Sequence, residues 1–529
     1  MTREALAASG AAAILSALLV WVGPPSGDFA AHAYQRAIYI QHGFELWNNF
    51  WYAGRYSFIT YSLLYYPLAA VVGIRLLAVI TVAIATLAFT IVVLRQWGSS
   101  ARWSSRTFAV VWAGIVLRAT FPFALGSALA LVAILALQRR RLWLFAAMAV
   151  LTLAASPVAF LMLAVILVGI AVGRRTDRRM LLGAGLAIGS LGLVEIVLWR
   201  VFPDDGHLPF SGWDLAAALV FCSFGTVLTW DDERTRILRF LFPVYGLACI
   251  AAFLVPSSLG GDNVIRLRYV AIPIAVLILA LREWRPRLLG AVAMALAISW
   301  NVMPLASSFA LASDDPAARA AFWAPAVTYL HRHLTPSYRV EAVDTSGHWP
   351  AYYLPRARIP LARGWYRQDD FPQNALLYGH LGPSTYLSWL RGLGVRYVVL
   401  ANVPPDYSAE AESRLLKSGR LPLRIVLVSP TLTIYEVPSP RPIVTGPGPS
   451  RVVSMREEGM TLRIDRPGTY RVAIRYTPYW HTSVGCVSQG KDRMIRLKMP
   501  RAGLAKMTFE VDPAGVLTEM AGGKPKACA

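Results

Sequence analysis

The first three hundred residues alternate between long apolar runs and short polar breaks. The apolar runs cover residues 5–22, 74–94, 104–117, 121–138, 142–155, 157–173, 181–199, 213–230, 237–255, 264–281 and 288–304. A membrane-spanning helix needs about 17–25 mostly apolar residues, which most of these runs approach, although 104–117 and 142–155 are short. The pattern predicts a polytopic α-helical membrane domain of about 11 transmembrane helices over residues 1–305.

Arginine clusters occupy alternate breaks between these runs. They are Arg95, Arg102 and Arg106; Arg139 to Arg141; Arg174, Arg175, Arg178 and Arg179; Arg234, Arg236 and Arg239; and Arg282, Arg285 and Arg287. Basic loops of this kind are typical of the cytoplasmic side. We therefore expect a multi-pass protein of the plasma membrane with a cytoplasmic N-terminus. Ser57–Val72 breaks this parity if it crosses, so we expect a re-entrant or surface-lying helix there.

The chain has 529 residues, of which 56% are hydrophobic and 16% charged, and its net charge is +22. This charge alone suggests a nucleic-acid partner. The arginines of the apolar part, however, cluster in alternate loops, whereas nucleic-acid binding needs basic residues on one folded face. We therefore expect the lipid bilayer as a partner and no nucleic acid.

From about Asp314 onward, charged residues, turn residues and short strand-like runs return. Residues 306–440 mix helical and strand patterns, which predicts an extracytoplasmic α/β domain. Residues 441–529 alternate strand-like pieces with turns, which predicts an extracytoplasmic β-sandwich. Tyr476, Tyr479, Trp480 and His481 in that part are a candidate carbohydrate-binding surface, with packing of the sandwich core as the alternative.

The four cysteines divide by location. Cys222 and Cys249 lie inside predicted spans, whereas Cys486 and Cys528 fall in the predicted extracytoplasmic part. Disulfides persist in oxidising compartments, so Cys486 and Cys528 are a disulfide candidate. No cysteine–histidine set has zinc-ligand spacing, and we assign no metal ligands.

The loop after the first span carries the first candidate chemistry. Asp28 and His32 are four residues apart, so both share one face of a helix. Asp28 is a candidate general base, with His32 orienting it or contacting a phosphate. An aspartate that caps a helix beside a surface histidine is the alternative. A divalent cation held by the pair is a third, with Asp204, Asp205 and Asp262 as further acidic residues.

A second group of polar residues precedes the span at 264–281. The segment GGDNVIRLRYV contains Asn263, Arg266 and Arg268, and Arg118 is a further arginine on the predicted outer side. Arginine binds phosphate through two parallel hydrogen bonds. Arginines that merely reach for the lipid headgroups are the alternative. The outer side is where few basic residues are expected, which favours a binding role.

Aromatic residues crowd the same first loop. They include Trp47, Trp51, Tyr52 and Tyr61, with Arg55 among them. Sugar rings stack on aromatic faces, and membrane-interface belts are rich in the same residues. The clustering beside Asp28 makes this set a candidate substrate-binding surface.

Taken together, these motifs resemble those of one enzyme class. An outward loop that begins with Asp28, followed by LWNNFWYAG and LLYYPL, and GDNVIRLRY before a late span are similar to sequences of polytopic glycosyltransferases of the GT-C fold class. The likeness is to the branch of YfhO-like proteins and actinobacterial arabinofuranosyl- and mannosyltransferases.

This resemblance implies an inverting enzyme that moves arabinofuranose or mannose from a polyprenyl-phosphate sugar to an envelope polysaccharide or glycolipid acceptor. It implies Asp28 as base and Arg266 or Arg268 as donor-phosphate contact. A second acidic motif is not present, so a divalent cation stays an alternative and no cofactor is assigned. The rival hypothesis is a non-enzymatic transporter of lipid-linked saccharides or an assembly scaffold, although no internal symmetry typical of transporters is found.

Overall fold

The computed structural model describes residues 1–529 except Ser26, 174–177, 204–205, 256, 258–259, 372, 523–527 and 529. Of the residues singled out above, Arg174, Arg175, Asp204 and Asp205 lie outside the described part, as does the side chain of Asp262. The chain forms two compact units. We call Met1–Phe29, Tyr61–Ile196 and Asp205–Ser313 the helical unit, and Ala30–Thr60, Val197–Asp204 and Asp314–Ala529 the mixed unit.

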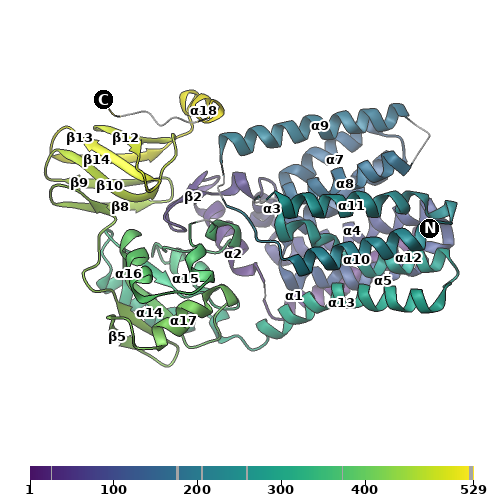
Figure 1. The fold of residues 1–529 in the computed structure, drawn as a ribbon, viewed down its shortest axis with the longest axis horizontal. Coiled ribbons are helices and arrows are strands. Elements are labelled where there is room, and N and C mark those ends of the chain that lie inside the picture. The colour runs from purple at the N-terminus through teal and green to yellow at the C-terminus, as the bar shows by residue number, and fades with distance from the viewer. Residues whose placement is uncertain are drawn as a thin grey trace. The chain divides into compact units, whose positions relative to one another are not determined.

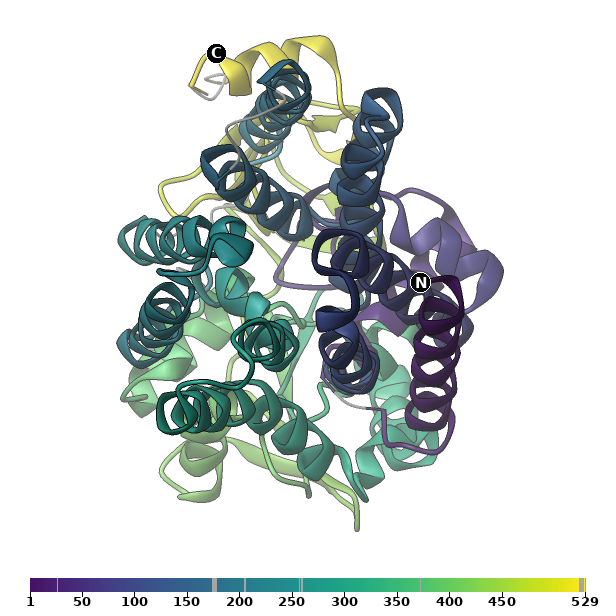
Figure 2. The same ribbon diagram turned by 90° about the vertical axis from the view of Figure 1, so that its right-hand side faces the viewer.

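All eleven apolar runs are helical in the structure, and Figures 1 and 2 show the helices from the side and end-on. They are α1 (Thr2–Trp21), α4 (Ile74–Trp97), α5 (Arg102–Ala113), α6 (Phe121–Gln138), α7 (Leu142–Ala155), α8 (Pro157–Gly173), α9 (Arg178–Val201), α10 (Gly212–Thr229), α11 (Arg236–Leu254), α12 (Ala271–Leu281) and α13 (Arg287–Ala312). Within the described residues, eight helical stretches are long and apolar enough to cross a membrane, and α7 and α8 are shorter apolar helices. The protein is therefore a polytopic membrane protein, whereas a count of eleven crossings stays a prediction.

The length of helix α3 and the end of helix α13 can be compared with the boundaries predicted from the sequence. Helix α3 (Tyr65–Val72) has 8 residues, about 12 Å at 1.5 Å per residue, so it is too short to cross the bilayer. This agrees with the expectation for Ser57–Val72. Helix α13 continues through Pro304 to Ala312, so the helical unit extends beyond the predicted boundary at 305.

The arginine-rich loops lie at one end of the helical unit. Arg106 pairs with Glu4 at the start of α1 at 2.7 Å. The indole of Trp97 donates to the carbonyl oxygen of Arg234 at 2.8 Å, and Arg234 in turn donates to that of Leu281 at 2.6 Å. These contacts join the N-terminus, the end of α4, the α10–α11 loop and the end of α12, so these segments lie on one side of the helical unit.

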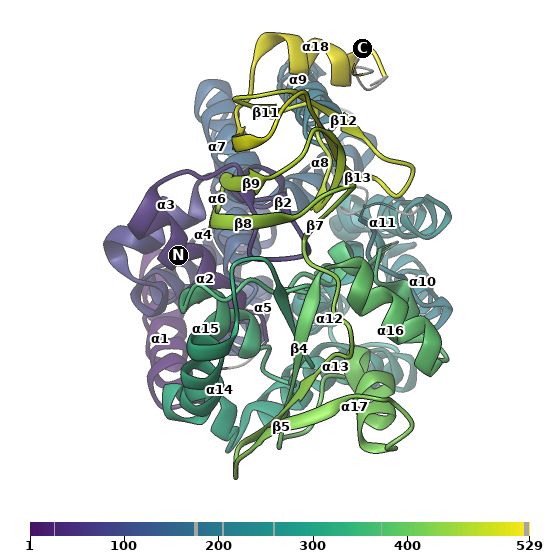
Figure 3. The ribbon, with the colours of Figure 1, turned by 90° about the vertical axis from the view of Figure 1, so that its left-hand side faces the viewer.

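The mixed unit contains a four-stranded sheet in the order β3-β4-β6-β5, whose elements Figure 3 shows. The strands are β3 (Arg339–Ala342), β4 (Val395–Ala401), β5 (Arg424–Val428) and β6 (Leu432–Glu436), of which β3 and β4 are parallel. Four helices accompany them: α14 (Ala320–His333), α15 (Pro350–Arg356), α16 (Pro383–Gly392) and α17 (Glu410–Lys417). Because side chains alternate along a strand, Val398 and Leu400 pack in the core with α16 and α17, while Tyr397 contacts Tyr329 of α14.

The last part of the mixed unit is a β-sandwich of two four-stranded sheets, β12-β13-β10-β7 and β11-β14-β9-β8. Its elements are β7 (Val444–Thr445), β8 (Ser450–Arg456), β9 (Gly459–Ile464), β10 (Gly468–Arg475), β11 (Trp480–Thr482), β12 (Cys486–Gln489), β13 (Met494–Met499), β14 (Gly503–Phe509) and α18 (Pro513–Met520). Both sheets contribute to one apolar core. A disulfide joins Cys486 to Cys528, the pair that the sequence suggested.

The first loop belongs to the mixed unit and not to the helices that precede and follow it. Residues Ala30–Thr60 contain α2 (Phe29–His42) and a small hairpin of β1 (Trp47–Asn48) and β2 (Arg55–Tyr56). The ring of Trp47 stacks on Phe509 of β14 at 5.2 Å. The predicted domain 1–305 therefore differs from the helical unit in this loop, because the aromatic side chains of the loop complete a core built from strands far along the chain.

Candidate active site

Asp28 is held in the helical unit by the backbone around it. Gly27 has a φ of +57°, and a Cβ added there would lie 2.2 Å from the carbonyl oxygen of Arg118. The backbone N–H of Asp28 donates to that same oxygen at 3.4 Å. Only glycine suits a positive φ in such close contact, so the backbone of Gly27 and Asp28 is held against residue 118, directly before α2.

Arg118 ends the 3-10 helix η3 (Gly114–Arg118). Ala119 has a left-handed conformation with a φ of 50°, which ends the helix abruptly. The Arg118 guanidinium donates from Nη1 to the hydroxyl of Ser308 on α13 at 2.8 Å. This hydrogen bond orients the arginine within the helical unit.

Arg266 and Arg268 lie on the 3-10 helix η5 (Gly261–Val270), which the Tyr245 hydroxyl of α11 anchors by donating to the carbonyl oxygen of Val264 at 3.0 Å. The guanidinium carbon of Arg268 lies 5.5 Å from the ring centre of Tyr269, and that of Arg266 lies 5.2 Å from Phe123.

The charges of Arg118, Arg266 and Arg268 all act on the buried hydroxyl of Tyr269. The structure thus brings the three predicted phosphate-contacting arginines together around one tyrosine that the sequence reasoning passed over.

Arg268 has unused hydrogen-bonding capacity. Its side chain is only 9% exposed, and its buried Nε has no hydrogen-bond partner in the described part of the chain. Leaving a buried charged donor unsatisfied costs more than a kilocalorie per mole, on the order of 1–3 kcal/mol for a neutral group and more for a charged one. An anionic oxygen from a ligand satisfies such a donor.

An apolar cavity of about 220 Å³ begins beside this cluster. It is lined mainly by side chains of α4, α6, α8, α11 and α12, and Arg266 is the only charged residue among the described residues that line it. Its lining runs along α6 from Phe123 to Gln138, which is about 22 Å at the helical rise of 1.5 Å per residue. The cavity is therefore long, apolar and cationic at one end.

The aromatic residues predicted to bind substrate are instead packed inside the mixed unit. Trp47, Trp51 and Tyr52 are at most 1% exposed. The Trp51 indole donates to the carbonyl oxygen of Ala351 at 3.0 Å, and the Tyr52 hydroxyl donates to that of Tyr366 at 2.9 Å. No face of these rings is open to a sugar in this structure, and packing within the mixed unit accounts for their clustering. Their role in substrate binding stays a prediction.

Arg55, from the same loop, forms a buried ion pair with Asp369 at 2.8 Å and lies 4.4 Å from the ring centre of Tyr366. Its charge is therefore paired within the mixed unit, and a contact of Arg55 with substrate stays a prediction.

Two members of the aromatic run of the β-sandwich are also packed in a core. Tyr479 is fully buried and Trp480 is 4% exposed, and both belong to the sandwich core. For Tyr479 and Trp480 the structure thus supports packing of the sandwich core, the alternative to a carbohydrate-binding surface.

The other predicted residues are placed as follows. His32 is fully buried in α2 of the mixed unit, Asn263 is buried on η5, and Tyr61 is half-buried at the start of the next segment of the helical unit. Their contacts to a substrate stay predictions. The described residues contain no group of three or more histidine, cysteine or acidic side chains suited to hold a metal ion.

No protein-family model and no curated protein matches the chain. Two similar solved structures are those of the arabinofuranosyltransferase AftD from mycobacteria and a mutant of it, each 15% identical, with TM-scores of 0.45 and 0.46. Each match covers 88% of this chain, which spans only 41% and 43% of those longer chains.

ArnT from Cupriavidus metallidurans bound to undecaprenyl phosphate is a third similar structure, 14% identical with a TM-score of 0.39, the match covering 82% of this chain and 98% of ArnT. These three similar structures are glycosyltransferases of the GT-C fold class.

Proposed function

We propose that this protein is an inverting glycosyltransferase that takes a sugar, arabinofuranose or mannose, from a polyprenyl-phosphate donor. The acceptor is an envelope polysaccharide or glycolipid on the outer face of the plasma membrane. The observation that carries the proposal is the apolar cavity with Arg266 at its rim, beside Arg118 and Arg268. A donor of this class has the matching form, a long hydrocarbon tail with one phosphate at its end.

The cavity and the arginines bind different parts of the donor. The tail enters the cavity, whose lining along α6 is about 22 Å long. The phosphate meets the arginines and satisfies the buried Nε of Arg268. Three guanidinium groups around one phosphate stabilise the negative charge that grows on it as the sugar departs.

Asp28 supplies the base. Its carboxylate accepts the proton of an acceptor hydroxyl, while the hydroxyl oxygen attacks the anomeric carbon of the donor from the face opposite the phosphate. The bond between that carbon and the phosphate oxygen breaks, and its electron pair leaves with the polyprenyl phosphate. One displacement of this kind inverts the anomeric configuration. The hydrogen bond between the Asp28 backbone and the Arg118 carbonyl keeps base and phosphate site in one unit.

Transfer by purified protein in proteoliposomes tests the proposal. Radiolabelled polyprenyl-phosphate arabinofuranose and mannose are supplied with envelope glycan acceptors, and label in the acceptor is measured. Asp28→Asn keeps the shape of the side chain and loses the base, so the rate should fall about 100-fold or more. Asp214→Asn, which changes an acid that receives a hydrogen bond from Ser211 at the start of α10, is the matched control and should keep wild-type activity.

Two outcomes contradict the proposal. Transfer by Asp28→Asn within tenfold of wild type removes Asp28 from the role of base. Passage of the labelled donor across the membrane with no new glycosidic bond, for every donor and acceptor supplied, indicates a transporter of lipid-linked saccharides instead.

A further inference from the structure

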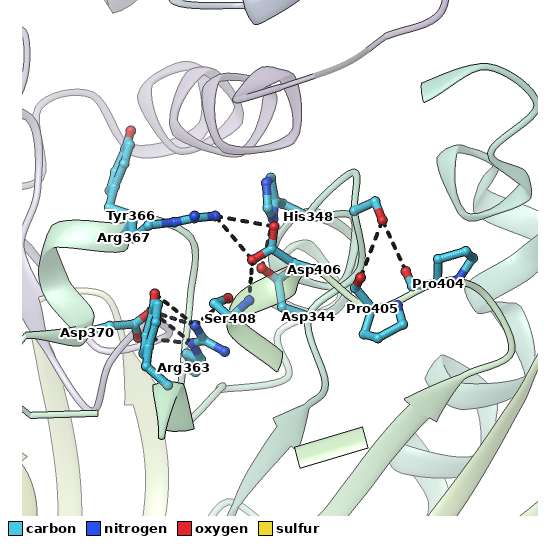
Figure 4. A network of polar contacts seen from close by, with 12 residues as sticks. Asp344, His348, Arg363, Tyr366, Arg367, Asp370, Pro404, Pro405, Asp406 and Ser408 are labelled. Carbon is cyan, nitrogen blue, oxygen red and sulfur yellow. Dashed lines mark hydrogen bonds and ion pairs between the residues drawn. The ribbon is translucent and has the colours of Figure 1, made fainter. Parts of the chain in front are cut away.

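A polar cluster in the mixed unit lies where two parallel strands, β3 and β4, and a segment bridged to β3 in parallel end. β3 ends at Ala342 and β4 at Ala401, and Leu361 pairs with Val340 of β3 in parallel. The carboxyl ends of parallel strands meet at one edge of a sheet, which is where α/β proteins bind their ligands. The segments that follow these strands supply every labelled residue of Figure 4. We call this cluster the carboxyl-edge cluster: Asp344, His348, Trp365, Arg367, Asp406 and Tyr407.

Opposite charges are paired within the carboxyl-edge cluster. The Nδ1 of His348 lies 2.7 Å from the Oδ2 of Asp344. Arg367 donates from Nη2 to both carboxylate oxygens of Asp406, at 3.2 and 3.1 Å. Figure 4 shows Arg367 and His348 converging on Asp406. Histidine and Arg367 hold the pKa of Asp406 below its ordinary value although burial opposes them, so the carboxylate is ionised at neutral pH.

His348 keeps one ring nitrogen for a ligand. Its side chain is 4% exposed and its ring stacks on Trp365 at 3.2 Å between centres. In the described part of the chain the Nδ1 contact is the only hydrogen bond of this ring. The Asp344 carboxylate orients the imidazole, and Nε2 is then available to donate or accept.

Tyr407 adds an aromatic face. Its side chain is 61% exposed, and the guanidinium carbon of Arg367 lies 3.9 Å from its ring centre. The arginine therefore covers one face of the ring and leaves the other open. Among the described residues from Asp314 onward, Tyr407 is the only exposed phenylalanine, tyrosine or tryptophan.

We propose that the carboxyl-edge cluster binds a neutral saccharide, a stretch of sugars of the acceptor glycan. The carboxylates of Asp344 and Asp406 would repel an anionic ligand, and Arg367 would repel a cationic one. Sugar hydroxyls both donate to carboxylates and accept from arginine and histidine, so they fit without a net charge. The apolar face of a sugar ring stacks on Tyr407.

The identity of the ligand as the acceptor rests on the proposed function, whereas saccharide binding at Tyr407 does not. Titration of the full-length protein in detergent micelles tests the binding, with a neutral arabinofuranosyl pentasaccharide and a neutral mannosyl pentasaccharide as probes. Tyr407→Ala should raise the dissociation constant of the bound probe at least tenfold, and His348→Gln should raise it as well. Phe44→Ala, at a residue of the mixed unit that is 47% exposed, is the control and should bind as the wild type does.

Tyr407 is mostly exposed, so its replacement should leave the thermal unfolding midpoint unchanged, and this is measured in the same samples. In the transfer assay, Tyr407→Ala should raise the KM for the acceptor while the KM for the donor and kcat stay as in the wild type.

A dissociation constant within twofold of wild type for Tyr407→Ala, or no binding of either probe to the wild type, overturns the inference even where transfer is found. Binding that depends on Tyr407 without any transfer supports this site and overturns the proposed function instead.

Discussion

A pair of buried glutamates makes the stability of the mixed unit depend on pH. Glu341 of β3 and Glu412 of α17 are both fully buried, and neither oxygen of Glu341 has a hydrogen-bond partner among the described residues. Burial raises the pKa of Glu412 to about 7, although the hydrogen bond from the Tyr386 hydroxyl opposes the shift. Burial, and then the charge of Glu412, raises the pKa of Glu341 well above its ordinary value.

The sign of the effect follows from proton binding. Between pH 4.5 and about 7 the folded protein holds a proton on Glu412 that the unfolded chain releases. The contribution of Glu412 to the free energy of unfolding is therefore fully present below pH 4.5 and is lost as the pH rises through about 7. At 1.36 kcal/mol per pKa unit, a shift from 4.5 to about 7 corresponds to a loss of about 3 kcal/mol.

Glu412→Gln should abolish this loss. The amide is neutral at every pH, and its oxygen accepts the Tyr386 hydrogen bond that the carboxyl accepts now. Urea unfolding of the full-length protein in detergent, followed by tryptophan fluorescence from pH 5 to pH 8, gives the slope of stability against pH. Because burial keeps the pKa of Glu341 raised in both proteins, the wild type should lose about 3 kcal/mol more than the variant over this range, and the variant should be the more stable protein at pH 8.

Glu410→Gln, an exposed position two residues earlier on α17, is the control and should follow the wild type. Equal slopes for Glu412→Gln and the wild type refute the reasoning, because the buried carboxyl then does not titrate between the two states.

Two further predictions concern the candidate active site. Arg268→Ala should raise the donor KM at least tenfold with little change in the acceptor KM. Arg268→Lys should restore only part of the loss, because an ammonium group cannot donate two parallel hydrogen bonds as a guanidinium does. Both KM values come from steady-state transfer kinetics, and a change confined to the acceptor KM contradicts the assignment. Gly27→Ala should reduce transfer strongly, because the new Cβ would lie 2.2 Å from the Arg118 carbonyl oxygen at a φ of +57°. Gly10→Ala in α1, with no atom within 4 Å of the added Cβ, is the control and should be active. Equal activity of the two variants means that the position of Asp28 does not depend on this contact.

The long apolar runs were predictable because helix formation in a membrane depends on local composition alone. Each run became a helix, and the strands of the C-terminal part were also visible as short apolar alternations. The arginine cluster was predictable for a related reason. Arg118, Arg266 and Arg268 stand on the side where few basic residues are expected, and the structure brings their charges together at Tyr269.

The fate of the first loop was not predictable from its own residues. Trp47 packs on Phe509, and the backbone N–H of Trp47 donates to Glu458 at 3.2 Å, so its partners lie more than four hundred residues away. A crowd of aromatic residues has the same sequence pattern whether it faces a sugar, a membrane surface or a distant strand. The carboxyl-edge cluster was missed for a different reason, since its residues come from three segments that only the parallel strand pairing brings together.

Burial of a side chain distinguishes a packing residue from a ligand-binding residue only when its hydrogen bonds are also considered. Trp51 and Tyr52 are as buried as any residue of the chain, and their polar atoms are satisfied by backbone groups of the mixed unit. Arg268 is nearly as buried, yet its Nε lacks a partner in the described residues. A folded protein tolerates an unsatisfied buried donor at a cost, and a ligand that supplies the missing acceptor recovers it. By this criterion Arg268, and not the buried aromatic residues of the first loop, is the position where we expect a ligand oxygen to supply the missing hydrogen-bond acceptor.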